Sequence, residues 1–246
     1  MVRYQLLIEY VGTNFRGWQI QKKGSTIQGL IQEKISKLLK EEIILCGSGR
    51  TDRGVHAIEQ SAHFDCKNKI IDLKRFIKSI NYFLNTKGIS ITKIKKKNNK
   101  FHSRFSAKQR IYKYIIFNQI NAPVIESKRG WHVRKPLDIE LIKKGAKKLI
   151  GTNDYSTFRS SSCHAKSPIR TIKSIKVRSL KNKIEIEFKS QSFLQQQVRS
   201  MVGCLKYLGE NKWDLKTFDK VFKSKKRILC APPAPPEGLF LLRVLY

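Results

Sequence analysis

A glycine-rich segment holds the residues of this chain that could do chemistry. Residues 47–57 read G-S-G-R-T-D-R-G-V-H-A, with one carboxylate, Asp52, between Arg50 and Arg53. Glycine adopts backbone conformations that other residues avoid, so several glycines in one segment indicate a tightly bent chain. We therefore expect a loop that is bent around a single carboxylate. We also expect Gly47 and Gly49 to let a bound partner approach the backbone closely.

Phosphate binding is one task of glycine-rich loops. A dinucleotide loop has the order G-x-G-x-x-G, but Asp52 stands at the place of the third glycine, and the G-K-S/T of a P-loop is absent. A carboxylate in a phosphate cradle would repel its ligand, which disfavours a nucleotide cofactor. The other simple reading is structural: aspartates often stabilise glycine-rich turns, with neighbouring arginines in solvent.

The composition indicates the class of partner. The 246 residues include 51 Lys+Arg and 18 Asp+Glu, which gives a formal net charge of +33. A genome biased toward lysine normally raises glutamate as well, and acids are scarce here. Excess cationic side chains bind phosphate chains and release counterions. We expect a nucleic acid as partner, and an acidic membrane surface is the weaker alternative.

The sequence contains no pattern typical of a membrane span, a disulfide framework or a metal site. No stretch approaches the roughly 18 to 20 apolar residues of a spanning helix, and residues 1–11 alternate as a strand does, unlike a signal peptide. The five cysteines lack a C-x-x-C pair, and the five histidines form no H-x-x-x-H or H-x-E pattern. We expect a cytoplasmic protein with reduced cysteines and no metal.

The elements that must position the loop alternate between strands and helices. In the first half we predict a strand over residues 2–10, a helix over 25–40 and a pair of strands over 43–46 and 60–65. A second helix over 72–84 and a strand over 89–94 follow. Ser25 and Asp72 are the expected N-caps of the two helices. In this reading, the strand over residues 43–46 leads directly into the loop that carries Asp52.

The second half nearly repeats this order. We predict strands over residues 110–117, 169–180, 184–189 and 239–245, and helices over 138–151, 193–208 and 215–222. The predicted fold class is α+β, with two similar halves, residues 1–105 and 106–246. Each half has a mostly antiparallel sheet with helices on one face, and the two sheets merge into one.

Separated motifs along almost the whole chain resemble those of the tRNA pseudouridine synthase A family, the TruA type. The loop motif is G-R-T-D-R-G-V-H-A. The others, in order, are Y-x-G-T-x-F-x-G-W-Q at 10–19, F-H-S-R-F-S-A with R-x-Y-x-Y at 101–114, G-T-N-D-Y-S-T-F at 151–158, Q-V-R-S-M-V-G at 197–203 and the tail A-P-P-E-G-L-F-L-L-R-V-L-Y at 234–246. The resemblance implies the pseudouridine synthase fold, with an active-site cleft between the halves.

The resemblance implies an isomerisation that needs no cofactor. The bond from ribose C1′ to uracil N1 breaks, and the base rejoins through C5. Asp52 corresponds to the family's catalytic aspartate, which either attacks C1′ or removes the 2′ proton. Carboxylates act in a similar way at glycosidic carbons. Arg199, in the Q-V-R motif, resembles the arginine that pairs with this aspartate, and such a cation favours the ionised carboxylate.

Two further residues correspond to family positions that handle an extruded base. A base inside a stem must be flipped out at a cost of a few kcal/mol. Tyr112 resembles the tyrosine that stacks on the flipped uracil, and its hydroxyl could also serve deprotonation at C5. Tyr114 fits a core residue of the same strand face better. Arg50 resembles the residue that enters the space left by the base.

Other basic residues are candidates for contacts with the RNA backbone. These are Arg53, Arg104, Lys108 and Arg110, together with lysines of the run 95–100. Each one alone is more often a solvated charge than a phosphate contact, but as a set they make binding depend on salt. Arg53 stands where many relatives have alanine, and residues 194–197 (L-Q-Q-Q) lack the histidines that some relatives carry.

The family's substrate is tRNA, at positions 38, 39 and 40 of the anticodon stem-loop, and its members act as homodimers. We expect both properties here. One alternative is a non-catalytic RNA-binding module, with Tyr112 and Tyr114 stacking on bases from an RRM-like sheet. A metal-dependent nuclease is the other alternative, and the lack of clustered acids disfavours it.

Overall fold

The computed structural model describes residues 1–246, which form two compact units. Unit 1 consists of Met1–Lys108 with Phe240–Tyr246, and unit 2 of Gln109–Leu239. These units differ at their ends from the halves 1–105 and 106–246 that we predicted, because the last strand pairs within unit 1.

The sheet of unit 1 positions the loop that carries Asp52. Its strand order is β4-β1-β3-β10, and β2 pairs with β3. The strands are β1 (Val2–Tyr10), β2 (Cys46–Gly47), β3 (His56–Cys66), β4 (Ile89–Lys97) and β10 (Leu239–Leu245). β1 runs antiparallel to β3 and β4, with Tyr4 opposite Phe64. β10 runs parallel to β3, with Phe240 opposite His56.

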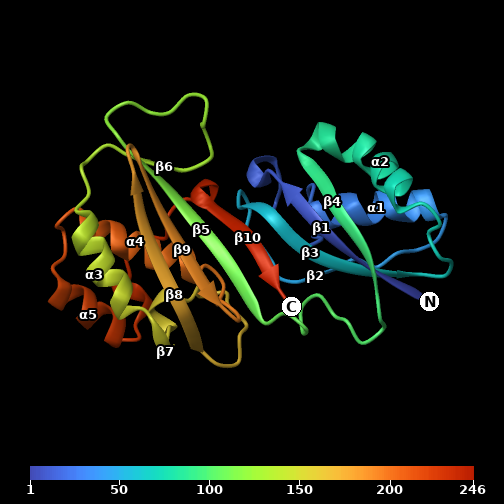
Figure 1. Cartoon of the computed structure of the whole chain (residues 1–246). Helices are drawn as coiled ribbons and strands as arrows, with labels where there is room; N and C mark the ends of the chain where they lie inside the picture. The colour runs from blue at the N-terminus through green and yellow to red at the C-terminus, as the bar shows by residue number, and fades with distance from the viewer. The chain divides into compact units, whose positions relative to one another are not determined.

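Two helices pack beside this sheet, and each begins at a side-chain cap. α1 (Ile27–Leu39) starts after Thr26, whose hydroxyl accepts from the Gly29 amide, so the predicted cap Ser25 is wrong by one residue. α2 (Leu73–Leu84) starts after Asp72, as predicted. α1 contacts α2, which lies against β4 (Figure 1). Short 3-10 turns lie at η1 (Gly12–Asn14) and η2 (Asn85–Lys87).

Unit 2 combines mostly antiparallel strands with three helices. The strand order is β5-β9-β8-β7, and the short β6 runs parallel to β5. The strands are β5 (Gln109–Asn118), β6 (Trp131–Val133), β7 (Gly151–Asp154), β8 (Ile169–Leu180) and β9 (Lys183–Ser190). β8 and β9 form a hairpin through residues 181 and 182, where Lys181 has the left-handed φ of 48°.

The helices of unit 2 pack against one another beside the β8–β9 hairpin (Figure 1). They are α3 (Ile139–Lys148), α4 (Gln197–Gly209) and α5 (Leu215–Lys223), with 3-10 turns η3 (Ser156–Phe158), η4 (Arg227–Leu229) and η5 (Pro236–Gly238). α4 is buried along most of its length. Its Gly203 is required, because a Cβ there would lie 2.1 Å from the Pro232 carbonyl oxygen.

The predicted class, α+β with mostly antiparallel strands, is confirmed. Two helix ends are corrected. The helix predicted from residue 193 begins at Gln197, because Gln196 has a left-handed φ of 60° and the Gln197 side chain accepts from the Leu194 amide. The helix predicted to reach Gly151 ends at Lys148, and Gly151 opens β7. No helix is long and apolar enough to cross a membrane.

Candidate functional site

The loop between β2 and β3 is held by hydrogen bonds on the side of β3. The Ser48 amide donates to the Ser61 carbonyl at 2.7 Å, and the Ser48 hydroxyl donates to Gln60 Oε1 at 2.7 Å. Gln60 Nε2 in turn donates to the Gly49 carbonyl at 3.0 Å. Ser48 and Gln60 are both buried, so these bonds are shielded from water and fix the first part of the loop.

The second part of the loop is fixed through Thr51, the neighbour of Asp52. The Thr51 hydroxyl lies 2.8 Å from the Tyr10 hydroxyl, and its carbonyl accepts from the Trp18 amide at 3.1 Å. After Asp52 the chain turns, and the Val55 amide donates to the Asp52 carbonyl at 3.2 Å. The half-buried Asp52 therefore lies between two anchored backbone segments.

Glycines allow the segment 10–19 to pack closely on this loop. A Cβ on Gly17, which has φ +96°, would lie 2.7 Å from the Thr51 carbonyl oxygen. A Cβ on Gly47 would lie 2.5 Å from Trp18 Nε1. Our expectation that Gly47 leaves room for RNA is therefore wrong: this glycine is needed because the Trp18 indole covers it. The loop motif and the motif at residues 10–19, which both resemble the family, therefore pack directly against each other.

Arg50 and Arg53 flank Asp52 and are both exposed. Two further candidate residues of unit 1, Arg104 and Lys108, are exposed as well, and the Arg104 guanidinium lies over the Phe105 ring at 5.5 Å. Exposed cations raise the local concentration of a polyanion. These four side chains can therefore attract a polyanion, and their contact with RNA stays a prediction.

The tyrosines of β5 share one face of unit 2. Tyr112 is 8% exposed and meets the Phe193 ring edge-on at 5.3 Å. Tyr114 is fully buried, and its hydroxyl donates to the Pro235 carbonyl at 2.7 Å. Burial raises the pKa of Tyr114 well above its ordinary value, the Glu237 carboxylate adds to this, and Arg199 opposes it. Tyr114 is therefore a core residue that keeps its proton.

Arg199 lies in the first turns of α4 and is tied to the segment before β10. Its Nε donates to the Ala234 carbonyl at 2.7 Å, and the Ala234 amide donates to the Arg199 carbonyl at 2.9 Å. The guanidinium is thus oriented by backbone groups.

Arg110 differs from the other RNA-binding candidates, because it is buried and donates to the Gln191 carbonyl.

The structure places Asp52, Arg50, Arg53, Arg104 and Lys108 in unit 1, with the first three on one loop. It places Tyr112, Arg110 and Arg199 in unit 2. The pairing of Asp52 with Arg199 and the stacking of Tyr112 on a base stay predictions.

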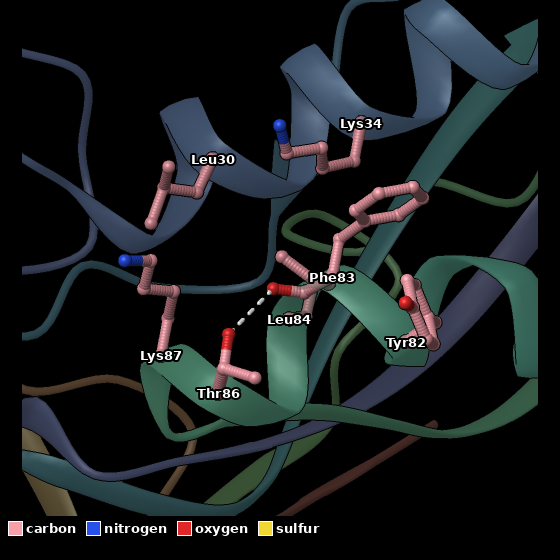
Figure 2. A pocket seen from close by; sticks show the side chains of 7 residues that line it. All are labelled: Leu30, Lys34, Tyr82, Phe83, Leu84, Thr86 and Lys87. Atoms are coloured by element: carbon pink, nitrogen blue, oxygen red, sulfur yellow. Dashed lines mark hydrogen bonds between the residues drawn. The ribbon is translucent and has the colours of Figure 1, made fainter.

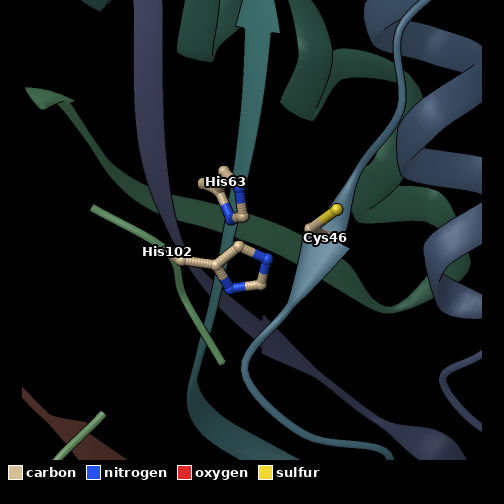
Figure 3. Close-up of side chains that lie close together, drawn as sticks. All are labelled: Cys46, His63 and His102. Carbon is tan, nitrogen blue, oxygen red and sulfur yellow. The ribbon is translucent and has the colours of Figure 1, made fainter. Parts of the chain in front are cut away.

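One cluster of possible metal ligands escaped the sequence patterns. Cys46, His63 and His102 have ligand atoms within 4.8 Å of one another (Figure 3). His63 Nδ1 lies 2.7 Å from the Ser103 hydroxyl, and His102 Nδ1 accepts from the Arg104 amide at 3.2 Å. A metal ion on either Nδ1 would have to replace these bonds, which hold the F-H-S-R turn. Spacing could not reveal the cluster, since folding alone joins these distant residues.

A pocket of about 460 Å³ lies between α1 and α2 (Figure 2). Its lining residues are Leu30, Lys34, Tyr82, Phe83, Leu84, Thr86 and Lys87. The Thr86 hydroxyl donates to the Phe83 carbonyl at 3.3 Å, which closes the end of α2. None of the predicted site residues lines this pocket.

In comparisons with known proteins, the chain matches one family. The family model described as tRNA pseudouridine synthase matches residues 6–106 and 146–246. This match includes Asp52 and Arg199 and leaves out the segment with Tyr112. The tRNA pseudouridine synthase A of Pelagibacter ubique (strain HTCC1062) is 70% identical over 246 residues. Those of Zymomonas mobilis subsp. mobilis and Parvibaculum lavamentivorans are each 39% identical. All three alignments cover 100% of both chains.

Proposed function

This chain belongs to the tRNA pseudouridine synthase family, and we propose that it converts uridine to pseudouridine at positions 38, 39 and 40 of the tRNA anticodon stem-loop, with Asp52 as the catalytic carboxylate. Its activity as an isomerase of tRNA uridine is supported by relatives that align over the whole chain. The anticodon arm and the roles of individual residues are our own assignments.

The reaction exchanges two bonds at the ribose. The C1′–N1 bond breaks and a C1′–C5 bond forms, while C5 loses a proton and N1 gains one. Substrate and product are isomers, so the overall reaction consumes neither a second substrate nor an oxidant. When the uracil leaves, positive charge develops on the sugar, and a carboxylate can stabilise or attack that centre. One well-placed acid is therefore enough to start the reaction.

The observation that carries the proposal is the fixation of the loop around Asp52. Buried hydrogen bonds of Ser48 and Gln60 hold the chain before Asp52, and Thr51 is bound by both Tyr10 and Trp18. A carboxylate on such a loop has little freedom to leave its position. Rigid placement of the reacting group lowers the entropy that must be lost in the transition state.

Arg199 and Tyr112 complete the proposed site. In the bound complex Arg199 would pair with Asp52 and favour its ionised form. Because Ala234 already holds the Arg199 Nε, the rest of the guanidinium is preorganised for such a pair. Tyr112 is buried against Phe193, so its ring must be uncovered before it can stack on a flipped uracil. Arg50 is exposed, as a side chain must be if it is to fill the space that the flipped base leaves in the RNA stem.

The test is a pseudouridine assay on unmodified tRNA with the variants Asp52→Ala and Asp52→Asn. We expect both variants to fold and to bind tRNA with nearly unchanged affinity, and to form no pseudouridine above background, because no other carboxylate replaces Asp52 on the loop. Glu59→Gln is the matched control, since Glu59 is an acid of the neighbouring strand that pairs with Arg243. This variant should keep full activity.

Three outcomes would overturn parts of the proposal. Product formed by Asp52→Ala would remove Asp52 from the mechanism. Pseudouridine mapped only outside the anticodon arm would refute the assigned substrate positions. Wild-type activity lost in EDTA would show that a metal ion takes part, and Cys46, His63 and His102 would then be its first candidate ligands.

A further inference from the structure

Two cysteines of unit 2 lie in direct contact although the sequence separates them. Cys204 lies in the middle of α4, and Cys230 directly follows η4. Their sulfur atoms are 3.4 Å apart. A disulfide bond has a length of about 2.05 Å, so the two sulfurs need to approach by only about 1.4 Å to be joined. The separation of the two sulfurs is thus small enough for a covalent link to form after a short movement.

The surroundings give the two sulfurs different chemistry. Cys204 is fully buried, while Cys230 is partly exposed. The pKa of Cys230 is lowered, first by its hydrogen bond with Cys204 and then by the Arg227 guanidinium, while burial opposes the shift. The same hydrogen bond, together with burial, raises the pKa of the Cys204 thiol. Cys230, which is partly exposed and lies beside Arg227, is therefore the more accessible and the more acidic of the two thiols.

Arg227 is itself held in place beside the pair. Its Nη1 donates to the hydroxyl of Ser200, which lies one turn before Cys204 on α4. A fixed cation next to a partly exposed thiolate is the environment in which reactive cysteines are found. A second thiol within contact distance gives such a cysteine a resolving partner.

We propose that Cys204 and Cys230 are a redox modification site that forms a reversible disulfide when the protein meets a peroxide. The Cys230 thiolate attacks one peroxide oxygen, so that an S–O bond forms and the O–O bond breaks. The hydroxide that leaves takes up the proton that the Cys230 thiol released on ionisation and becomes water. The Cys204 sulfur then attacks the sulfenic sulfur of Cys230. The S–S bond forms, and the sulfenic oxygen leaves with the Cys204 proton as water. Two thiols are oxidised, and one hydrogen peroxide is reduced to two waters.

The remaining cysteines lack this arrangement. Burial raises the pKa of Cys46 and of Cys66, which lowers their thiolate content. The Cys66 thiol donates to backbone carbonyl groups of Val2 and Asn68. Cys163 is buried. The peroxide reaction should therefore select Cys230, and in a reducing compartment the resulting link would be transient, as a sensing site requires.

The link would join two segments that already pack together. Residues 232–234 pack against α4, where Ala234 bonds Arg199 and Pro232 lies against Gly203. A disulfide at Cys230 would tie the chain just before this segment to the helix. Because a cross-link restricts the unfolded chain, the oxidised form should unfold at a higher temperature than the reduced form.

The experiment treats the full-length protein with a small excess of hydrogen peroxide and maps its thiols by mass spectrometry without reduction. The free thiol count should fall from five to three. One cross-linked peptide pair should contain Cys204 and Cys230, and dithiothreitol should restore all five thiols. In Cys204→Ser we expect no cross-link and a sulfenic acid at Cys230 that dimedone traps. Cys163→Ser, the matched control, should cross-link as the wild type does.

The proposal fails if Cys46, Cys66 or Cys163 is oxidised while the pair stays reduced. It also fails if wild-type Cys230 proceeds to sulfinic acid without a link to Cys204. The thiol map of the wild-type protein tests the proposal even if a cysteine variant fails to fold. The readout counts thiols and involves no tRNA, so this result is independent of the proposed enzyme activity.

Discussion

Thr51 shows how a single residue can fix a reacting group without being one. Its hydroxyl and its carbonyl are both engaged, by Tyr10 and by Trp18, and it is buried beside the half-buried Asp52. The carboxylate is thus positioned by backbone on both sides of it. Gly17 permits this contact, because any larger residue there would collide with the Thr51 carbonyl.

His63 predicts how unit 1 responds to acid. Burial lowers its pKa to about 4, and the neighbouring His102 and Arg3 add to the effect, while Asp65 opposes it. The ordinary pKa is near 6.5, so between about pH 6.5 and 4 the unfolded chain binds the proton more readily. Stability is therefore lost as pH falls through this window, by at most about 1.4 kcal/mol per pH unit for this group.

The measurement is urea unfolding at pH 7 and pH 5. His63→Gln should reduce the loss of unfolding free energy between these two values. His164→Gln removes an exposed histidine and should leave the wild-type loss in place. If His63→Gln and wild type lose the same free energy on acidification, the buried imidazole is not the source of acid sensitivity.

At the scale of elements, β10 is held within unit 1 by the contacts of Tyr246 as well as by strand pairing. The Tyr246 hydroxyl donates to the Ser103 carbonyl at 2.9 Å and lies 2.7 Å from the Ser61 hydroxyl on β3. The Tyr246 ring also packs against Phe101 at 4.9 Å. The end of the last strand thus links β3 to the F-H-S-R turn.

Tyr246→Phe should therefore destabilise the protein while it keeps the aromatic packing. We expect the free energy of unfolding to fall by about 1 to 2 kcal/mol, because the hydrogen bonds to Ser103 and Ser61 are lost. Denaturant unfolding measures this difference. Tyr82→Phe is the control, since the Tyr82 side chain is 78% exposed, and its stability should not change. Equal stability of both variants would contradict the anchoring role of Tyr246.

Local patterns were enough to predict several of the longer elements, although the strand predicted over residues 60–65 spans His56–Cys66. The strands Val2–Tyr10, Ile169–Leu180 and Leu239–Leu245 have the predicted bounds, and Asp72 caps its helix, because alternation and capping depend on adjacent residues. β6 and β7 were missed, since strands of three and four residues are defined by their pairing with β5 and β8. The start of α4 depends on the unusual backbone of Gln196, which no propensity predicts.

For the whole molecule, the net charge of +33 predicts a strong salt dependence of tRNA binding. Cations that contact phosphates release bound counterions, so the logarithm of the association constant should fall linearly with the logarithm of the salt concentration. We expect affinity to drop by at least about tenfold between 50 and 200 mM potassium chloride, measured by filter binding or fluorescence anisotropy. The variant Lys95→Ala/Lys96→Ala, from the cationic run of β4, should show a shallower slope. A salt-independent affinity would contradict electrostatic binding.

The sequence indicated the candidate acid but not its surroundings. Asp52 stands out because its motif is continuous and unusual. The contact between Tyr10 and Thr51, the cluster of Cys46 with His63 and His102, and the sulfur contact of Cys204 with Cys230 all join distant segments. Each arises from tertiary packing, so no spacing rule along the chain could have revealed them.

The position of β10 in the chain has a consequence for biosynthesis. Unit 1 is built from residues 1–108 and 240–246, whereas unit 2 is the continuous stretch between them. A ribosome therefore makes all of unit 2 before it makes the strand that pairs beside His56 and Ala57. Translation of unit 1 therefore begins first, but unit 1 is completed last. While residues 109–239 are being made, the β3 strand that follows the Asp52 loop still lacks its parallel neighbour β10.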